Sequence, residues 1–197
     1  MKSLLKPAAV LFALLLLMGA TDEKPRLGFK GLGPVQIGAS EAELQALGFS
    51  DPYRSADWQT DEEYAACHYL SNEAEYPGVG FMINDGKLVR IGIRVNDAGI
   101  IWQTLSGATI GMTETEVAAI YGDWLKIDHH PYTGDAGSYL ILQSADRRYK
   151  MIFETAVQGG DDEPHSSAPF QGFNAEKFVT DFRAGLAGPV SFIEGCS

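Results

Sequence analysis

The stretch Ile110-Gly-Met-Thr-Glu-Thr-Glu-Val-Ala-Ala-Ile-Tyr-Gly122 predicts a short helix whose two ends are both specified by its own residues. Thr113 is a typical N-cap, and Glu116, three residues later, completes a capping box. Gly122 can adopt the left-handed conformation that ends a helix. The residues at i, i+3 and i+4 share one apolar face, which consists of Val117, Ile120 and Tyr121.

A similar stretch lies 73 positions earlier, Ile37-Gly-Ala-Ser-Glu-Ala-Glu-Leu-Gln-Ala-Leu-Gly48. Here Ser40 and Glu43 form the capping box, and Gly48 ends the helix. The apolar face consists of Leu44 and Leu47. Two copies of a capped helix indicate a duplicated unit, which constrains the fold but does not reveal which molecule the protein acts on.

Segments with the patterns of β-strands follow the first helix. We expect three strands there, at 67–70, 79–83 and 87–95. Asn84-Asp85-Gly86 predicts a tight hairpin turn before the third strand. That strand alternates cleanly, so one face should be buried and the other should hold Arg90 and Arg94 in water. The buried face consists of Val89, Ile91, Ile93 and Val95. Segment 58–66 fits either a short helix or a loop.

The second helix is followed by a similar order of elements. We expect strands at 138–144, 149–155 and 190–194. Asp146-Arg147-Arg148 is predicted to form the turn between the first two of these strands. Segments 123–137 and 156–174 are predicted to be loops, and 175–186 fits either a short helix or a strand.

These patterns predict an α+β fold in which a helix plus an antiparallel meander occurs twice. The two tandem repeats, residues 32–104 and 105–197, should join their strands into one open sheet with the helices on one face. The opposite face would then stay open to solvent or to a partner. Residues 21–31 are polar and charged and are predicted to be a flexible leader.

The N-terminus has the pattern of a secretory signal peptide. Residues 1–6 carry two lysines, and residues 8–20 are almost wholly apolar. This apolar segment is too short to span a bilayer. We therefore predict that residues 1–20 are a signal peptide and that the protein is periplasmic or secreted. The alternative is an uncleaved anchor.

The charge of the chain is strongly acidic. It has 26 Asp and Glu against 15 Lys and Arg, so the net charge is −11, and removal of the two lysines of residues 1–20 makes it −13. Such a chain should repel nucleic acid and anionic lipid. The acidity suits a basic partner, or it is simply a solvated acidic surface. The 177 residues that remain suit one domain or two small tandem units.

The two cysteines, Cys67 and Cys196, predict a disulfide if the protein is exported. The bond would tie the start of a strand in the first half to the last strand of the second half. It would close a loop of well over 100 residues, which stabilises by about 4–5 kcal/mol in the chain-entropy model. Two free thiols are the alternative, and the lack of a Cys-x-x-Cys motif argues against a catalytic dithiol.

The segment Gly111-Met-Thr-Glu-Thr-Glu-Val-Ala-Ala-Ile-Tyr-Gly122 resembles the helix-opening signature of the SmpA/OmlA outer-membrane assembly lipoproteins. The same signature occurs in the β-lactamase-inhibitory-protein family, which is similar to two tandem copies of this unit. The resemblance implies a tandem α+β fold and an exported binding or inhibitory protein. Two features depart from these families: the chain has no lipidated cysteine, and its one possible disulfide would span the halves instead of lying within each repeat.

The most metal-like cluster is His129 and His130, preceded by Asp128. Further ligands would come from the loop at 156–174, namely Asp161, Asp162 and His165. Zinc needs about four well-placed ligands, and neighbouring histidines in an extended segment point to opposite sides. A hydrogen-bonded loop histidine is therefore favoured over a ligand. The acidic residues of the loop also lack the spacing of an EF-hand, so we predict no metal and no cofactor.

The sequence lacks the Gly-x-Ser-x-Gly, His-Glu-x-x-His, P-loop and GxGxxG motifs. This favours a non-enzymatic binding or inhibitory module that engages another exported protein through the open sheet face. Large aromatic rings suit such a surface, although packing into the core is the alternative for each. The candidate partner-binding residues are Trp58, Tyr69, Tyr132, Tyr139, Asp161 and Asp162. Alternative functions are a small envelope hydrolase that uses His129 or His130 with a carboxylate, and a structural cell-envelope factor.

Overall fold

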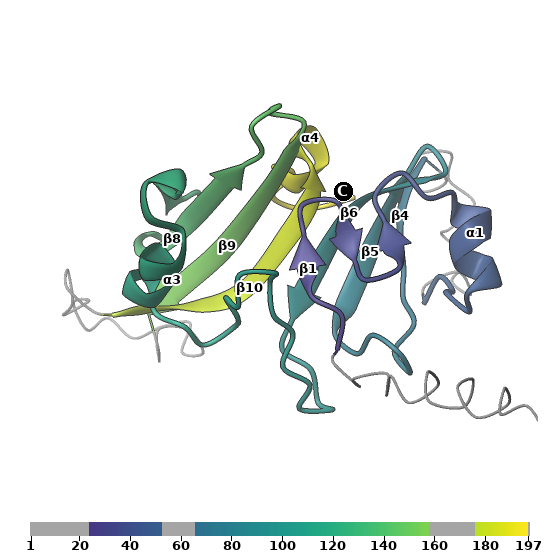
Figure 1. Cartoon of the computed structure of the whole chain (residues 1–197), viewed down its shortest axis with the longest axis horizontal. Coiled ribbons are helices and arrows are strands. Elements are labelled where there is room, and N and C mark those ends of the chain that lie inside the picture. The colour runs from purple at the N-terminus through teal and green to yellow at the C-terminus, as the bar shows by residue number, and fades with distance from the viewer. Residues whose placement is uncertain (1–23, 53–65, 158–175, 197) are drawn as a thin grey trace, which may run out of the picture.

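The computed structural model describes residues 24–52, 66–157 and 176–196. The fold is α+β, with antiparallel strands in two sheets (Figure 1). The small sheet has three short strands, β1 (Leu27–Gly28), β2 (Gly31–Leu32) and β3 (Val35–Gln36). The predicted signal peptide and the segments 58–65 and 158–174 lie outside the described residues.

The large sheet has seven strands in the order β4-β5-β6-β10-β9-β8-β7. The strands of the first half are β4 (Cys67–Leu70), β5 (Val79–Asn84) and β6 (Lys87–Arg94). Those of the second half are β7 (Lys126–His130), β8 (Gly134–Gln143), β9 (Tyr149–Val157) and β10 (Lys177–Leu186). The two halves meet in the middle of the sheet, where β6 pairs antiparallel with β10. Segment 175–186, which fitted a helix or a strand, is thus largely a strand.

Two helices begin at the predicted caps. Ser40 caps α1 (Glu41–Ala46) and Thr113 caps α3 (Glu114–Tyr121), each with a complete capping box. A short 3-10 turn, η2 (Gly122–Trp124), follows α3. Val117 is fully buried, as predicted, but Leu47 is 58% exposed because α1 has already ended at that residue.

The segments before the two helices contact the large sheet in the same way. Each makes two backbone hydrogen bonds with one residue of a central strand, Leu88 of β6 or Val179 of β10. The N–H groups donate from Gly38 to Leu88 (2.7 Å), from Leu88 to Ala39 (2.8 Å), from Gly111 to Val179 (2.9 Å) and from Val179 to Met112 (2.8 Å). Both helices are therefore attached to the central pair of strands.

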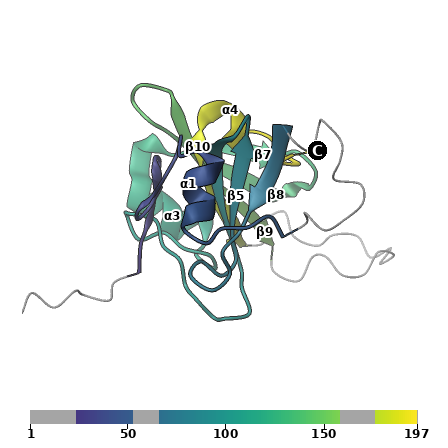
Figure 2. The same cartoon turned by 90° about the vertical axis from the view of Figure 1, so that its right-hand side faces the viewer.

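The main core lies between one face of the large sheet and α1, α3 and the small sheet. In the end-on view of Figure 2, α1 and α3 lie on the same side of the strands, and the C-terminus lies on the other. Leu27 of β1 is fully buried in this core. The prediction of a flexible leader at 21–31 is therefore wrong for its later residues, because they form β1 and pair with β2.

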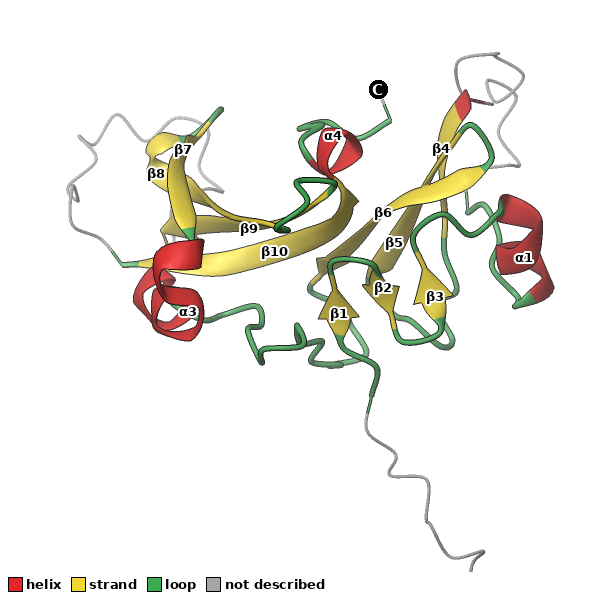
Figure 3. Ribbon diagram, turned by 45° about the horizontal axis from the view of Figure 1, so that its top comes forward, coloured by secondary structure: helices red, strands yellow, loops and turns green. Residues whose placement is uncertain are grey.

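The opposite face of the large sheet is partly covered by the chain's own C-terminus, contrary to the prediction of an open face. After β10 the chain turns into α4 (Ala187–Val190), which packs over β9 and β10 (Figure 3). Residues 191–196 then run back to Cys67, to which Cys196 is joined by a disulfide with a Cα–Cα distance of 5.4 Å. We call residues 187–196 the C-terminal strap. The strand predicted at 190–194 is wrong, because these residues pair with no strand.

Two strands also differ from the sequence prediction. In β6 the register shifts opposite Met82 and Ile83, which leaves Val89 as an extra residue in a β-bulge. Leu88 therefore joins the core with Ile91, while Arg90 stays on the opposite face and is buried there by the strap instead of lying in water. In the second half, β7 lies within the predicted loop 123–137 and forms the edge of the sheet.

No helix within the described parts of the chain is long and apolar enough to cross a membrane.

Candidate functional site: a cleft between the central strands and the strap

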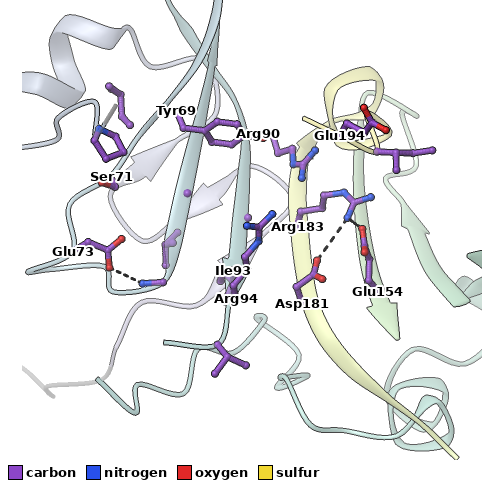
Figure 4. Close-up of a pocket in the computed structure, with 18 residues that line it drawn as sticks. Tyr69, Ser71, Glu73, Arg90, Ile93, Arg94, Glu154, Asp181, Arg183 and Glu194 are labelled. Atoms are coloured by element: carbon purple, nitrogen blue, oxygen red, sulfur yellow. Dashed lines mark hydrogen bonds and ion pairs between the residues drawn. The ribbon is translucent and has the colours of Figure 1, made fainter. Parts of the chain in front are cut away.

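A cleft of about 600 Å³ lies on the strap side of the large sheet. Its floor is formed by β5, β6 and β10, so both halves of the chain contribute to it. Tyr69 of β4 forms one wall, and Ile193 and Glu194 of the strap form another. Figure 4 shows the arginine side chains of β6 and β10 on this side of the sheet, with Asp181 and Glu154 beside Arg183.

Two paired glycines form part of the floor. Gly80 of β5 lies opposite Gly92 of β6, and Gly92 in turn lies opposite Arg183 of β10. A Cβ atom at Gly92 would meet only the Cβ of Arg183, at 4.0 Å, and a Cβ at Gly80 would meet the ring of Tyr69 at 3.5 Å. The floor is therefore backbone, and the space above Gly92 is open because no side chain fills it.

Arg183 is the most buried charge of the site, with only 2% of its side chain exposed. Its Nη1 forms an ion pair with Glu154 of β9 and lies 3.7 Å from an oxygen of Asp181. Its Nε donates to the carbonyl of Val190 in the strap, at 2.8 Å. Its guanidinium carbon lies 5.2 Å from the ring of Tyr139. Arg183 thus joins the strap to the sheet and neutralises a buried carboxylate.

The two carboxyl groups beside Arg183 respond differently to it. Burial raises the pKa of Glu154, but the charge and hydrogen bond of Arg183 outweigh burial, so the pKa is lowered overall. Burial, followed by the charge of Glu154, raises the pKa of Asp181 to about 6. Asp181 therefore keeps its proton to a higher pH than an ordinary aspartate.

Arg90 is the second buried arginine, with 7% exposure. Its Nη1 donates to the carbonyl of Phe192 in the strap, at 2.8 Å. Neither its Nε nor the Nη2 of Arg183 has a hydrogen-bond partner among the described residues. Desolvation lowers the pKa of Arg90 from its ordinary value. The cleft therefore contains arginine donors whose hydrogen-bonding capacity is not used by the described parts of the chain.

The predicted contact residues lie in different environments. Tyr69 lines the cleft, and Tyr132 is 64% exposed and donates a hydrogen bond to Glu194 of the strap, at 2.5 Å. Tyr139 is buried against Ile152 and Val190, so its prediction as a surface contact is corrected. The other candidates lie outside the described residues, namely Trp58, Asp161 and Asp162.

The two adjacent histidines point to different neighbours. His129 is exposed and lies 3.5 Å from Asp135. His130 accepts backbone N–H groups of Tyr132 and Thr133 at Nδ1, both at 3.2 Å, and its Nε2 lies 3.4 Å from Glu154. Because Nδ1 accepts, the proton is assigned to Nε2 and is shared with Glu154. Both nitrogens of His130 are therefore engaged, which disfavours the base of a hydrolase.

No group of three or more His, Cys, Asp or Glu side chains suited to a metal ion occurs in the described part of the chain. The segment that holds Asp161, Asp162 and His165 is outside that part.

The arginine and carboxylate cluster was missed by the sequence reasoning. A usable signal was present in β10, where Asp181 and Arg183 are two residues apart and must share one face of any strand. The same face of β6 carries Arg90, Gly92 and Arg94. Their meeting depends on the pairing of β6 with β10, which no local pattern specifies.

In comparisons with known proteins, no family model, no curated protein and no solved structure matches this chain.

Proposed function

We propose that this chain is an exported, non-enzymatic binding or inhibitory module that engages another exported protein through the cleft. The observation that supports this proposal best is the glycine floor, where Gly92 leaves room for an inserted side chain beside Tyr69, whose ring lies over Gly80. A concave site with an aromatic wall and fixed polar groups is typical of a recognition surface.

The rim of the cleft supports a protein as the ligand. Phe192 and Ile193 of the strap are 46% and 42% exposed, and Tyr132 lies beside them through its bond to Glu194. Exposed aromatic and aliphatic side chains next to a desolvated arginine cluster resemble the anchors of protein interfaces. The partner would thus contact the strap while one of its side chains enters the cleft.

We further propose that the two halves of the chain are tandem repeats of one helix-plus-meander unit, related to the lipoprotein and inhibitor families that the helix signature resembles. Matching contacts support this proposal: each helix follows a segment that makes the same two backbone bonds with a central strand. The central strands β6 and β10 are antiparallel neighbours, as a two-fold relation between the halves requires.

An oxidising location, the periplasm or the outside of the cell, belongs to the same proposal. The disulfide between Cys67 and Cys196 supports it, because such bonds persist in oxidising compartments. The strong negative charge remains compatible with a protein partner and disfavours nucleic acid.

Affinity capture with matched variants tests the binding proposal. The mature chain would be immobilised and exposed to periplasmic and culture-supernatant extract from the native organism, beside Gly92→Val and Thr115→Val. Valine at position 92 fills the open floor, whereas valine at position 115 is exposed on α3, on the other side of the large sheet. We expect the same protein to be captured by wild type and Thr115→Val and to be lost with Gly92→Val. Equal capture by all three would contradict a role for the cleft.

A further inference from the structure

The carboxylates of the cleft are already occupied by donors of the protein itself. Glu154 pairs with Arg183, and Asp181 lies near the same guanidinium group. At the rim, Glu194 accepts the hydroxyl of Tyr132, and Glu73 accepts the backbone N–H of Gly78 at 3.0 Å. The acidic groups therefore do not make the cleft a free site for a cation.

The arginines of β6, unlike these carboxylates, have hydrogen-bond donors that are not paired. Arg90 and Arg94 flank Gly92 on one face of the strand, and all three residues line the cleft. Among the described residues the buried Nε of Arg90 has no hydrogen-bond partner, and the exposed side chain of Arg94 forms no hydrogen bond or ion pair. Arg94 lies opposite Asp181 in the sheet and acts on it only through its charge. The cleft groups that remain unpaired among the described residues are thus positively charged hydrogen-bond donors.

We propose that the cleft binds a carboxylate of the protein partner, the side chain of an aspartate or glutamate, above Gly92 and between Arg90 and Arg94. This inference rests on the proposed function, because it names the group that enters the site. Figure 4 shows both arginine side chains on the cleft side of β6. Arginine presents several N–H donors in a planar fork that matches a carboxylate.

The charge balance on the central strands suits a carboxylate better than a phosphate. The three arginines there face two carboxylates, Glu154 and Asp181, so one added negative charge would balance them and a dianion would exceed that balance. Gly92 allows the ligand to approach the sheet closely, since nothing but backbone lies beneath it. A bound carboxylate would also bring a negative charge close to Arg90, whose own charge burial has removed from water.

The test uses the side-chain Nε–Hε NMR signals of arginine in the folded, isotope-labelled chain at pH 5.5. The probe is the blocked peptide acetyl-Gly-Gly-Glu-Gly-Gly-amide, with the peptide that has Gln in place of Glu as its matched control. We expect the signals of Arg90 and Arg94 to shift with the glutamate peptide and to stay in place with the glutamine peptide. Arg148, in an exposed turn, is the internal reference and should not shift.

Two variants make the result decisive even though Arg90 also holds the strap. Arg94→Gln removes an exposed charge that forms no hydrogen bond or ion pair with a described residue and acts on Asp181 only through its charge, so the fold should be retained and the peptide should bind about tenfold more weakly. Gly92→Val should abolish the shift. Equal responses to both peptides, or shifts shared by Arg148, would overturn the inference. If Gly92→Val still abolished partner capture while the glutamate peptide shifted nothing, the inference would fail and the proposed function would stand.

Discussion

The buried arginine of β10 offers a quantitative test of how the strap face is held together. Arg183→Met keeps an unbranched, apolar side chain of similar length but removes the charge that neutralises Glu154. It also removes the hydrogen bond to the carbonyl of Val190. Glu154 is only 19% exposed, so its charge would be left largely uncompensated. Removal of one partner from such a pair costs about 3–5 kcal/mol.

His130 lowers this expectation toward the smaller figure, because its Nε2 lies 3.4 Å from Glu154 and can still donate to it. We therefore expect Arg183→Met to lose about 3 kcal/mol of unfolding free energy at pH 7. Arg183→Met combined with Glu154→Gln should recover most of this loss. The double variant should lie within about 1.5 kcal/mol of wild type, which is the worth of the hydrogen bond to Val190 that stays lost.

Urea unfolding of wild type, the single variant and the double variant at pH 7 measures both values, provided that the m-values agree. A single variant within about 1 kcal/mol of wild type would show that Glu154 is not effectively buried. A double variant as unstable as the single one would show that the loss comes from packing and not from the unpaired carboxylate. Either outcome would refute the reasoning.

Three further predictions concern the rest of the fold. The pKa of Asp181 is about 6 in the folded protein, against an ordinary value of 3.8. The native state therefore binds this proton more tightly than the unfolded chain does, so stability falls as the pH rises from about 4 to above 6. Asp181→Asn should therefore gain on the order of 1–3 kcal/mol at pH 8 and almost nothing at pH 4, in urea titrations at both pH values. Replacing Cys67 and Cys196 by serine removes a cross-link between residues 129 positions apart and should lower the free energy of unfolding by up to about 5 kcal/mol. The urea midpoint should be lower than that of wild type, and adding a reducing agent should no longer change it. Thr113→Ala removes the N-cap of α3 and should cost about 1 kcal/mol by thermal or urea unfolding, with Thr115→Ala as its control within the helix.

Local signals in the sequence predicted local structure well. The capping boxes at Ser40 and Thr113 depend on residues three positions apart, so no distant contact is needed to form them. The turn before β6 depends on Asp85 and Gly86, which have φ values of 49° and 69°. Such a two-residue turn fixes the hairpin by its own backbone preferences.

The strap and the cleft could not be predicted in this way. Alternation along β6 placed Arg90 on the correct face, but the strap covers that face and buries the side chain. A bulge at Val89 turns Leu88 toward the core. Burial of Arg183 depends on α4, Glu154 and Tyr139, which come from three different elements. The residue pattern of one strand does not indicate which other elements will pack over it.

The candidate aromatic residues differ in their exposure. Tyr69 lines the cleft because it lies on β4 opposite Met82, facing the strap. Tyr139 lies on the same face of the sheet but is covered by Val190. The sequence indicates that a large aromatic ring lies on a strand. Whether that ring can contact a partner depends on which other segments pack over it, and the strand's own sequence does not specify them.

The most direct test of the account is a map of the backbone amide signals that shift when the captured partner is added to the isotope-labelled mature chain. We predict shifts at Tyr69, Gly92 and Arg94 and along the strap, with α1 and α3 unchanged. Shifts confined to the two helices, with the cleft signals unmoved, would contradict the claim that the cleft is the binding site.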